Sequence, residues 1–148
     1  AGWFLLQHNI IEDHRKAGGQ PAAAAGVAEQ SELMQKAVQM VEWSFTKGWD
    51  AKEEGGGLLY FMDVDGYSPT QLEWSMKLWW PHCEALVAYS LLYRHTRDYR
   101  HLRTFLQVMD YTLGKFSDPE HGEWFGYLDR AGRVSQRFKG GPYKGCFH

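Results

Sequence analysis

The sequence has few cysteines, no long apolar run and no marked excess of either charge. Its two cysteines, Cys83 and Cys146, are too few for a disulfide framework, which favours a reducing, cytoplasmic setting. No apolar run approaches the roughly 18 residues of a membrane-spanning helix. Sixteen basic against eighteen acidic residues give a net charge of −2, which offers no basic surface to nucleic acid or an anionic membrane. We therefore expect a neutral or mildly charged small ligand, and neither a nucleic-acid nor a membrane partner.

Apolar residues, in contrast, are plentiful. Hydrophobic residues make up 44% of the chain and aromatic residues 16%, enough for the core of one domain. The chain starts at Ala1 without a helix cap and stops directly at His148. We expect residues 1–148 to form a single partial domain, an internal fragment of a longer protein.

An internal repeat is indicated by two aromatic, proline-bearing segments that each carry a histidine. Shifting the sequence by 66 positions places His82 on His148. The same shift aligns Met40 with Leu106, Phe45 with Tyr111, Phe61 with Tyr127, Asp63 with Asp129 and Gly66 with Gly132. Repeats of this kind are typical of stacked helical units. The two histidines are therefore expected to occupy equivalent places in successive units.

Apolar periodicity predicts helical patterns in four parts of the chain. They span residues 2–14, 31–46, 71–95 and 98–116. Pro81 is expected to kink or divide the third pattern, because proline lacks an amide donor and clashes with the preceding turn. A break there would place His82, Cys83 and Glu84 in the first turn of the second piece.

Short aromatic segments lie between these helical patterns. Residues 58–62 and 123–128 each follow a glycine-bearing connection and precede a turn, so we expect a small hairpin at each. Helix pairs with hairpins at one end favour a ring of helical hairpins, in which helix ends and loops line a central cleft.

The tryptophans are candidates for the walls of such a cleft. Trp74, Trp79, Trp80 and Trp124 offer flat apolar faces with an N–H at the rim, which suits a sugar's C–H face. The alternative is that each is buried in the core. Neighbouring helical residues point about 100° apart, so Trp79 and Trp80 cannot both face one core stripe.

Four segments resemble the N-acylglucosamine 2-epimerase family, also called renin-binding protein. They are residues 1–6, 69–85, 122–127 and 139–148. The similarity covers nearly the whole chain apart from about residues 15–32, an Ala- and Gly-rich stretch that we interpret as an insertion-like loop. Family members are longer and fold as an (α/α)6 toroid. The resemblance therefore implies an all-α chain, a C-terminal-side portion of such a toroid with short β-hairpins between its helices.

The resemblance also implies interconversion of N-acetylglucosamine and N-acetylmannosamine through proton removal and return at C2 of the open-chain sugar. His148 matches one of two family histidines that act on opposite faces of the carbon, and the other would precede Ala1. Glu84 matches a functional family acid, expected to orient a histidine or to hydrogen-bond the sugar. His82 is a further catalytic candidate, which could polarise the carbonyl oxygen or accept a hydroxyl proton. Imidazole suits such chemistry because its unperturbed pKa is about 6.5.

Further predictions concern binding. Trp79, Trp80, Trp124 and Lys144 are the predicted substrate-binding residues. No metal ion is expected, because the regular close spacing of zinc ligands is missing. The family implies ATP as an activator that is not consumed, although the Gly-x4-Gly-Lys-Ser/Thr pattern is not met. A homodimer and a renin-like protease are the candidate macromolecular partners.

Two other readings of the function remain open. One is a related aldose–ketose isomerase or a disaccharide 2-epimerase, which shares the removal of the C2 proton. The other is a protein that binds a protease and has no catalytic activity.

Overall fold

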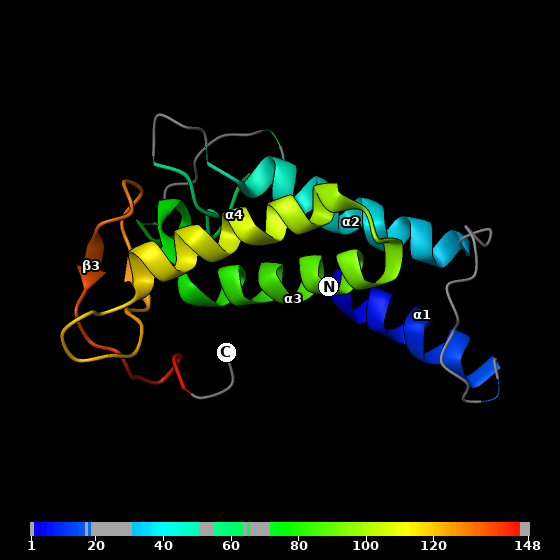
Figure 1. The fold of residues 1–148 in the computed structure, drawn as a ribbon. Helices are drawn as coiled ribbons and strands as arrows, with labels where there is room; N and C mark the ends of the chain where they lie inside the picture. Colours follow the sequence, from blue (N-terminus) through cyan, green and yellow to red (C-terminus); the bar gives the residue numbers. More distant parts are fainter. Residues whose placement is uncertain are drawn as a thin grey trace.

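The structure, a computed structural model, describes residues 2–16, 18, 31–50, 55–63, 65 and 72–145. These residues form mainly helices, with a small antiparallel sheet at one end (Figure 1). The helices are α1 (Gly2–Lys16), α2 (Glu32–Gly48), the 3-10 helix η2 (Leu72–Ser75), α3 (Trp79–Thr96) and α4 (Tyr99–Phe116). The strands are β1 (Lys77–Leu78), β2 (Tyr127–Leu128) and β3 (Val134–Gln136), in the order β1-β2-β3.

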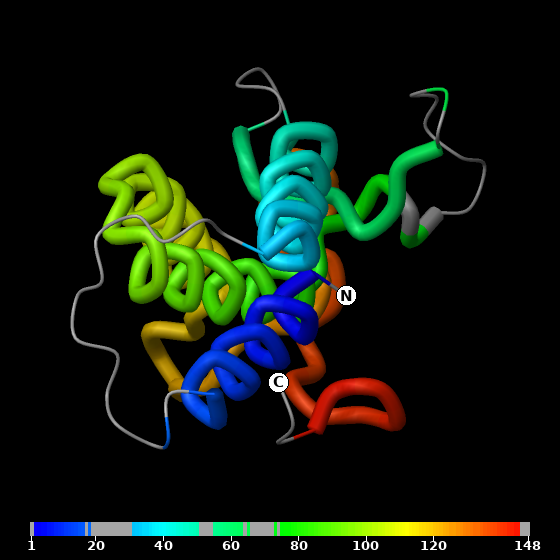
Figure 2. The backbone as a smooth tube through the Cα atoms, turned by 90° about the vertical axis from the view of Figure 1, so that its right-hand side faces the viewer, coloured from blue at the N-terminus to red at the C-terminus, as the bar shows by residue number. Residues whose placement is uncertain are grey.

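The four α-helices pack as two antiparallel pairs. Helix α1 pairs with α2 and α3 pairs with α4, while α1 also packs beside α3 (Figures 1 and 2). Helices α1 and α3 run in the same direction, and α1 begins beside α3 near the middle of the molecule (Figure 1). Among the described residues, no helix is both long and apolar enough to cross a lipid bilayer.

Side-chain caps determine where two of the helices begin. The Ser31 hydroxyl accepts a hydrogen bond from the Met34 N–H at 3.2 Å and caps α2. The Asp98 carboxylate accepts one from the Arg100 N–H at 2.8 Å and caps α4. The helices predicted over residues 2–14, 31–46 and 98–116 are confirmed to within two residues at each end.

The helix predicted over residues 71–95 is only partly correct. Helix η2 and strand β1 occupy its first part, and α3 begins at Trp79. Pro81 therefore lies in the first turn of α3, where a missing N–H costs nothing because no carbonyl of the helix could accept from it. Strand β1 is extended because it pairs with β2, a tertiary contact that the local apolar pattern does not contain.

The second predicted hairpin is confirmed. Strands β2 and β3 pair across a turn in which the Gly132 N–H donates to the Asp129 carbonyl at 3.0 Å. Glycine is favoured at this position because its φ is +77°, in the left-handed region. The Asp129 side chain closes the turn by accepting from the Arg133 N–H at 2.9 Å.

The first predicted hairpin, at residues 58–62, differs from the second. Leu58 forms an isolated antiparallel bridge with Trp49, and the Tyr60 N–H donates to the Met76 carbonyl at 2.9 Å. Its predicted turn, like residues 17 and 19–30 of the insertion-like loop, lies largely outside the described residues. The 66-residue shift carries Leu58 onto Trp124, which bridges with Ser117. In both units the bridge partner is the residue that directly follows the preceding helix, Trp49 after α2 and Ser117 after α4.

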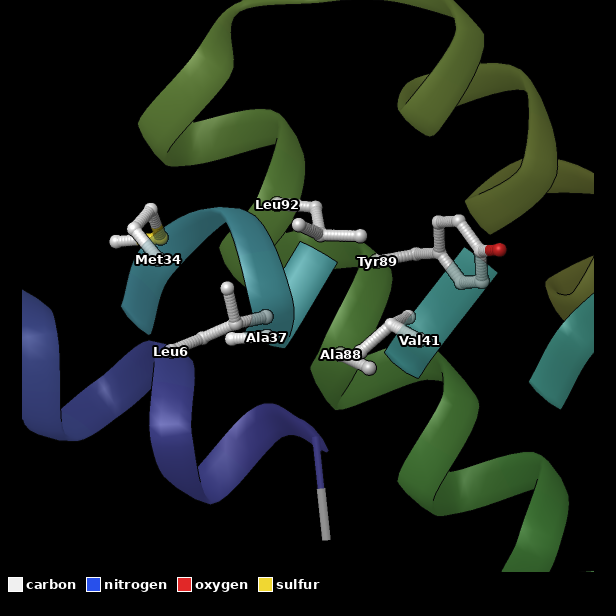
Figure 3. Packing of buried hydrophobic residues seen from close by; sticks show 7 residues of the cluster. All are labelled: Leu6, Met34, Ala37, Val41, Ala88, Tyr89 and Leu92. Carbon is white, nitrogen blue, oxygen red and sulfur yellow. The ribbon is translucent and has the colours of Figure 1, made fainter. Parts of the chain in front are cut away.

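Two apolar clusters form the core of the described part. The first joins α1, α2 and α3 and includes the residues labelled in Figure 3: Leu6, Met34, Ala37, Val41, Ala88, Tyr89 and Leu92. The second lies between the sheet and the adjoining ends of α3 and α4, with Met76, Leu78, Trp79, Phe116 and Leu128 at its centre. Gly2 allows α1 to approach α2 closely, because a Cβ there would lie 2.7 Å from Val41 Cγ2.

A buried ion pair connects the chain after α2 to the sheet. Lys77 of β1 is 0% exposed, and its Nζ lies 2.9 Å from Asp50 Oδ2. The Lys77 ammonium also donates to the Arg130 carbonyl, and the Arg130 guanidinium lies 3.5 Å from Asp50. These contacts hold the turn after β2 against the end of α2.

Candidate active site

A cavity of about 360 Å³ opens where the first turn of α1 meets the second half of α2 and the first half of α3. Its walls are mainly apolar and aromatic. They include Trp3 of α1, Phe45 of α2, Leu58, and Trp80, Glu84 and Tyr89 of α3. Among the described residues that line it, Glu84 alone carries a carboxylate. The arrangement can therefore hold a ligand with apolar faces and hydroxyl groups that donate to an acid.

Glu84 is held from the neighbouring helix. The indole N–H of Trp3 donates a hydrogen bond to Glu84 Oε2, joining the first turn of α1 to α3 across 81 positions of sequence. Trp3 in turn stacks on Phe4, with ring centroids 3.8 Å apart. The carboxylate keeps its position in the cavity through a contact between two parallel helices.

Trp79 and Trp80 diverge, as the helical geometry predicts. Trp80 lines the cavity, and its ring meets Tyr60 edge-to-face at a centroid distance of 5.8 Å. Trp79 is 2% exposed and packs against Tyr127 at 5.5 Å. Of the two predicted substrate-binding residues, the structure brings only Trp80 next to Glu84.

His82 is fully buried and both ring nitrogens contact the backbone. Nε2 accepts a hydrogen bond from the Leu58 N–H at 2.9 Å, which places the proton on Nδ1, 2.6 Å from the Leu78 carbonyl oxygen. The pKa of His82 is lowered to about 4, mainly because burial disfavours the charged ring; the hydrogen bond to Leu78 opposes this shift and the Lys77 charge adds to it. The ring stacks on Tyr111 at 5.3 Å. These contacts favour a structural role, and the catalytic role of His82 stays a prediction.

Trp124 lines a second hollow, and Lys144 contacts one of the residues in its wall. Lys144 Nζ is 3.1 Å from Glu123 Oε1 and 5.9 Å from the centre of the Trp79 ring, and the residue is 6% exposed. Trp124 lines this hollow together with Glu123 and Cys83. Burial raises the pKa of the Cys83 thiol, and so does the charge of the adjacent acid on α3. The predicted substrate-binding residues are thus divided between two places.

Other predicted site residues fall outside this geometry. His148, the first catalytic candidate, lies outside the described residues, and its role stays a prediction. Over the described ranges, no three His, Cys, Asp or Glu side chains gather as a metal site would require. Trp3 was absent from the predicted site. It belongs to a segment that carries the family resemblance, but no local pattern relates it to Glu84.

Comparison with known proteins gives the family. A family model described as N-acylglucosamine 2-epimerase (GlcNAc 2-epimerase) matches residues 22–147. The chain belongs to the N-acylglucosamine 2-epimerase family. It is 50% identical to N-acylglucosamine 2-epimerase of Homo sapiens over 148 residues, covering 100% of this chain and 31% of that protein. The chain thus spans less than a third of the length of this curated relative of the N-acylglucosamine 2-epimerase family.

Solved structures agree on the fold. The crystal structure of a D-mannose isomerase superposes with a TM-score of 0.70 at 22% identity, covering 93% of this chain and 30% of that one. A cellobiose 2-epimerase from Bacillus thermoamylovorans B4167 superposes with a TM-score of 0.61 at 19% identity, covering 97% of this chain and 33% of that one. The prediction of an all-α portion of an (α/α)6 toroid is confirmed. Within this N-acylglucosamine 2-epimerase family fold, the cavity lies at the ends of two neighbouring parallel helices.

Proposed function

We propose that the protein is a sugar 2-epimerase that interconverts N-acetylglucosamine and N-acetylmannosamine. Membership of the N-acylglucosamine 2-epimerase family supports this function. The observation that carries it is the Glu84 carboxylate, held by Trp3 in a cavity whose walls are mainly apolar and aromatic. Such a cavity suits a neutral sugar, since aromatic rings cover its C–H faces and a carboxylate accepts hydrogen bonds from its hydroxyl groups.

The reaction requires a base at C2. In the open-chain sugar, the base takes the C2 proton, and the electron pair of the C–H bond forms a C1–C2 double bond while the aldehyde oxygen gains the charge. Return of a proton to the opposite face of C2 inverts that carbon. We propose His148 as one base, because imidazole exchanges protons near neutral pH. Glu84 orients this base or accepts a hydrogen bond from a sugar hydroxyl group, and Trp80 packs against the sugar.

The remaining features of the proposal rest on the family resemblance and on composition. ATP acts as an activator that is not consumed. The protein forms a homodimer, binds a renin-like protease and works in the cytoplasm, where its two cysteines stay reduced.

The test is proton exchange measured beside product formation. The intact protein is incubated with N-acetylglucosamine in D2O, and NMR follows deuterium at C2 and the appearance of N-acetylmannosamine, with and without ATP. Both signals are expected, and a Glu84→Gln variant should slow both. Absence of exchange and of product under all conditions would overturn the epimerase proposal and favour a non-catalytic binding protein.

A second candidate is aldose–ketose isomerisation, which the similarity to the D-mannose isomerase structure favours. Both reactions begin with removal of the C2 proton. They differ in the next step, because an isomerase delivers the proton to C1 and yields a ketose. Incubation with mannose separates the two, since fructose is formed only by an isomerase.

A further inference from the structure

We propose that Trp3 is a positioning residue, whose indole N–H holds the Glu84 carboxylate in the orientation that the reaction requires. The inference rests on the function proposed for Glu84. We assign Trp3 to the orientation of that acid and not to proton transfer.

The contact is well placed for this purpose. Trp3 and Glu84 lie at the starts of two parallel helices and line the same cavity, with the indole N–H donating to Oε2. The position of Trp3 is itself constrained, because Gly2 beside it lies against Val41 too closely for any Cβ. This close contact holds the backbone that carries Trp3 against α2.

The Trp3 indole is a suitable partner for a carboxylate in this cavity. Glutamate has three rotatable side-chain bonds, so a hydrogen bond to one carboxylate oxygen limits the orientations that the group can take. A neutral donor at Oε2 fixes the plane of the carboxylate and leaves its charge in place. A lysine or arginine at the same point would neutralise the acid, whereas an indole does not.

The variant that tests this inference is Trp3→Phe in the intact protein. It keeps an aromatic ring and removes the N–H. We expect kcat to fall by about 10- to 100-fold, the usual effect of losing a hydrogen bond to a charged group. Trp43→Phe is the matched control, because Trp43 of α2 is 62% exposed and does not line the cavity. It should leave kcat unchanged.

A double-mutant cycle separates positioning from general structural damage. In a Glu84→Ala background, Trp3→Phe should change kcat by less than 3-fold, because the acid on which the indole acts is gone. An equal loss of kcat in both backgrounds would overturn the inference.

A spectroscopic readout makes the test independent of activity. The indole 1H–15N signal of Trp3 is assigned by its loss in Trp3→Phe, and it should shift upfield in Glu84→Ala as the hydrogen bond disappears. The indole signal of Trp43 should not move. An unchanged Trp3 signal would overturn the inference even in an active enzyme. A shifted signal in a protein that epimerises no sugar would support the contact while the proposed function fails.

Discussion

The imidazole of His82 accepts a hydrogen bond from the backbone N–H of Leu58 at 2.9 Å. Its other nitrogen bonds the Leu78 carbonyl, so one buried ring ties the segment before η2 to the start of α3. Glu84 lies two residues further along the same helix. His82, a predicted catalytic residue, thus fixes the start of the helix that carries Glu84.

Replacement of His82 should follow this geometry. Gln offers both a carbonyl acceptor for Leu58 and an amide donor for Leu78, so His82→Gln should cost no more than about 1 kcal/mol of unfolding free energy. His82→Ala leaves the Leu58 N–H without its acceptor beside a void and should cost about 3 kcal/mol or more of unfolding free energy. Urea unfolding of the intact protein measures both. Equal destabilisation by Gln and Ala would contradict the assignment.

The depressed pKa of His82 predicts a pH dependence of stability. The folded chain holds this ring neutral down to a pH of about 4, whereas the unfolded chain protonates it near its ordinary value of 6.5. The unfolded state therefore binds more protons in this window, and stability falls as the pH is lowered from about 6.5 towards 4. The slope approaches about 1.4 kcal/mol per pH unit at most. Urea unfolding between pH 7 and pH 5 should show this contribution in wild type and not in His82→Gln.

Gly57 and Gly114 make a matched pair for backbone tests. Gly57 has a φ of +88°, and a Cβ there would lie 2.4 Å from Tyr111 Cζ, so Gly57→Ala should destabilise by about 3 kcal/mol. Gly114 lies within α4 with nothing within 4 Å of a Cβ, so Gly114→Ala should stabilise by up to about 1 kcal/mol. Thermal unfolding compares the two. A loss of stability from Gly114→Ala would show that the helix packs differently.

The buried pair of Lys77 and Asp50 should show strong coupling. Lys77→Met removes the nearer partner of the buried Asp50 carboxylate and leaves it the more distant contact with Arg130. The unfolding free energy should fall by about 3 kcal/mol. Removing both charges with Lys77→Met and Asp50→Leu should recover most of that loss. Chemical unfolding of the two single variants and the double variant gives the interaction free energy between the two side chains. Additive effects would mean that the charges act independently.

His148→Ala should abolish epimerisation in both directions while sugar binding persists. A positioned base acts mainly in the transition state, and its loss typically lowers the rate by about 10² to 10⁴. The measurements are kcat in each direction and substrate affinity by calorimetry. A variant that retains near-normal kcat would exclude His148 as a base.

Much of the fold was predictable from short-range patterns. The ranges of α1, α2 and α4 follow from apolar periodicity, and the cap at Ser31 follows from residue type. The β2–β3 hairpin follows from its aromatic residues and the turn around Gly132. In each case the residues that decide the conformation lie within one or two turns of each other.

Part of the site was also predictable. Glu84 and Trp80 were singled out, and they share a cavity in the structure. Trp79 and Lys144 were singled out by the same reasoning and lie elsewhere, against Tyr127 and Glu123. Aromatic or charged character marks a residue as a candidate, but which way it faces depends on where its helix or loop is anchored.

The amino-acid order alone determined where the chain can form α1, α2, α4 and the second hairpin, because these depend on contacts close in sequence. Tertiary structure decided that β1 is extended, that His82 faces Leu58, and that Trp3 reaches Glu84. The last two contacts join residues 24 and 81 positions apart. These contacts form and stabilise the chain only once the helices have packed, so no local pattern of residues predicts them.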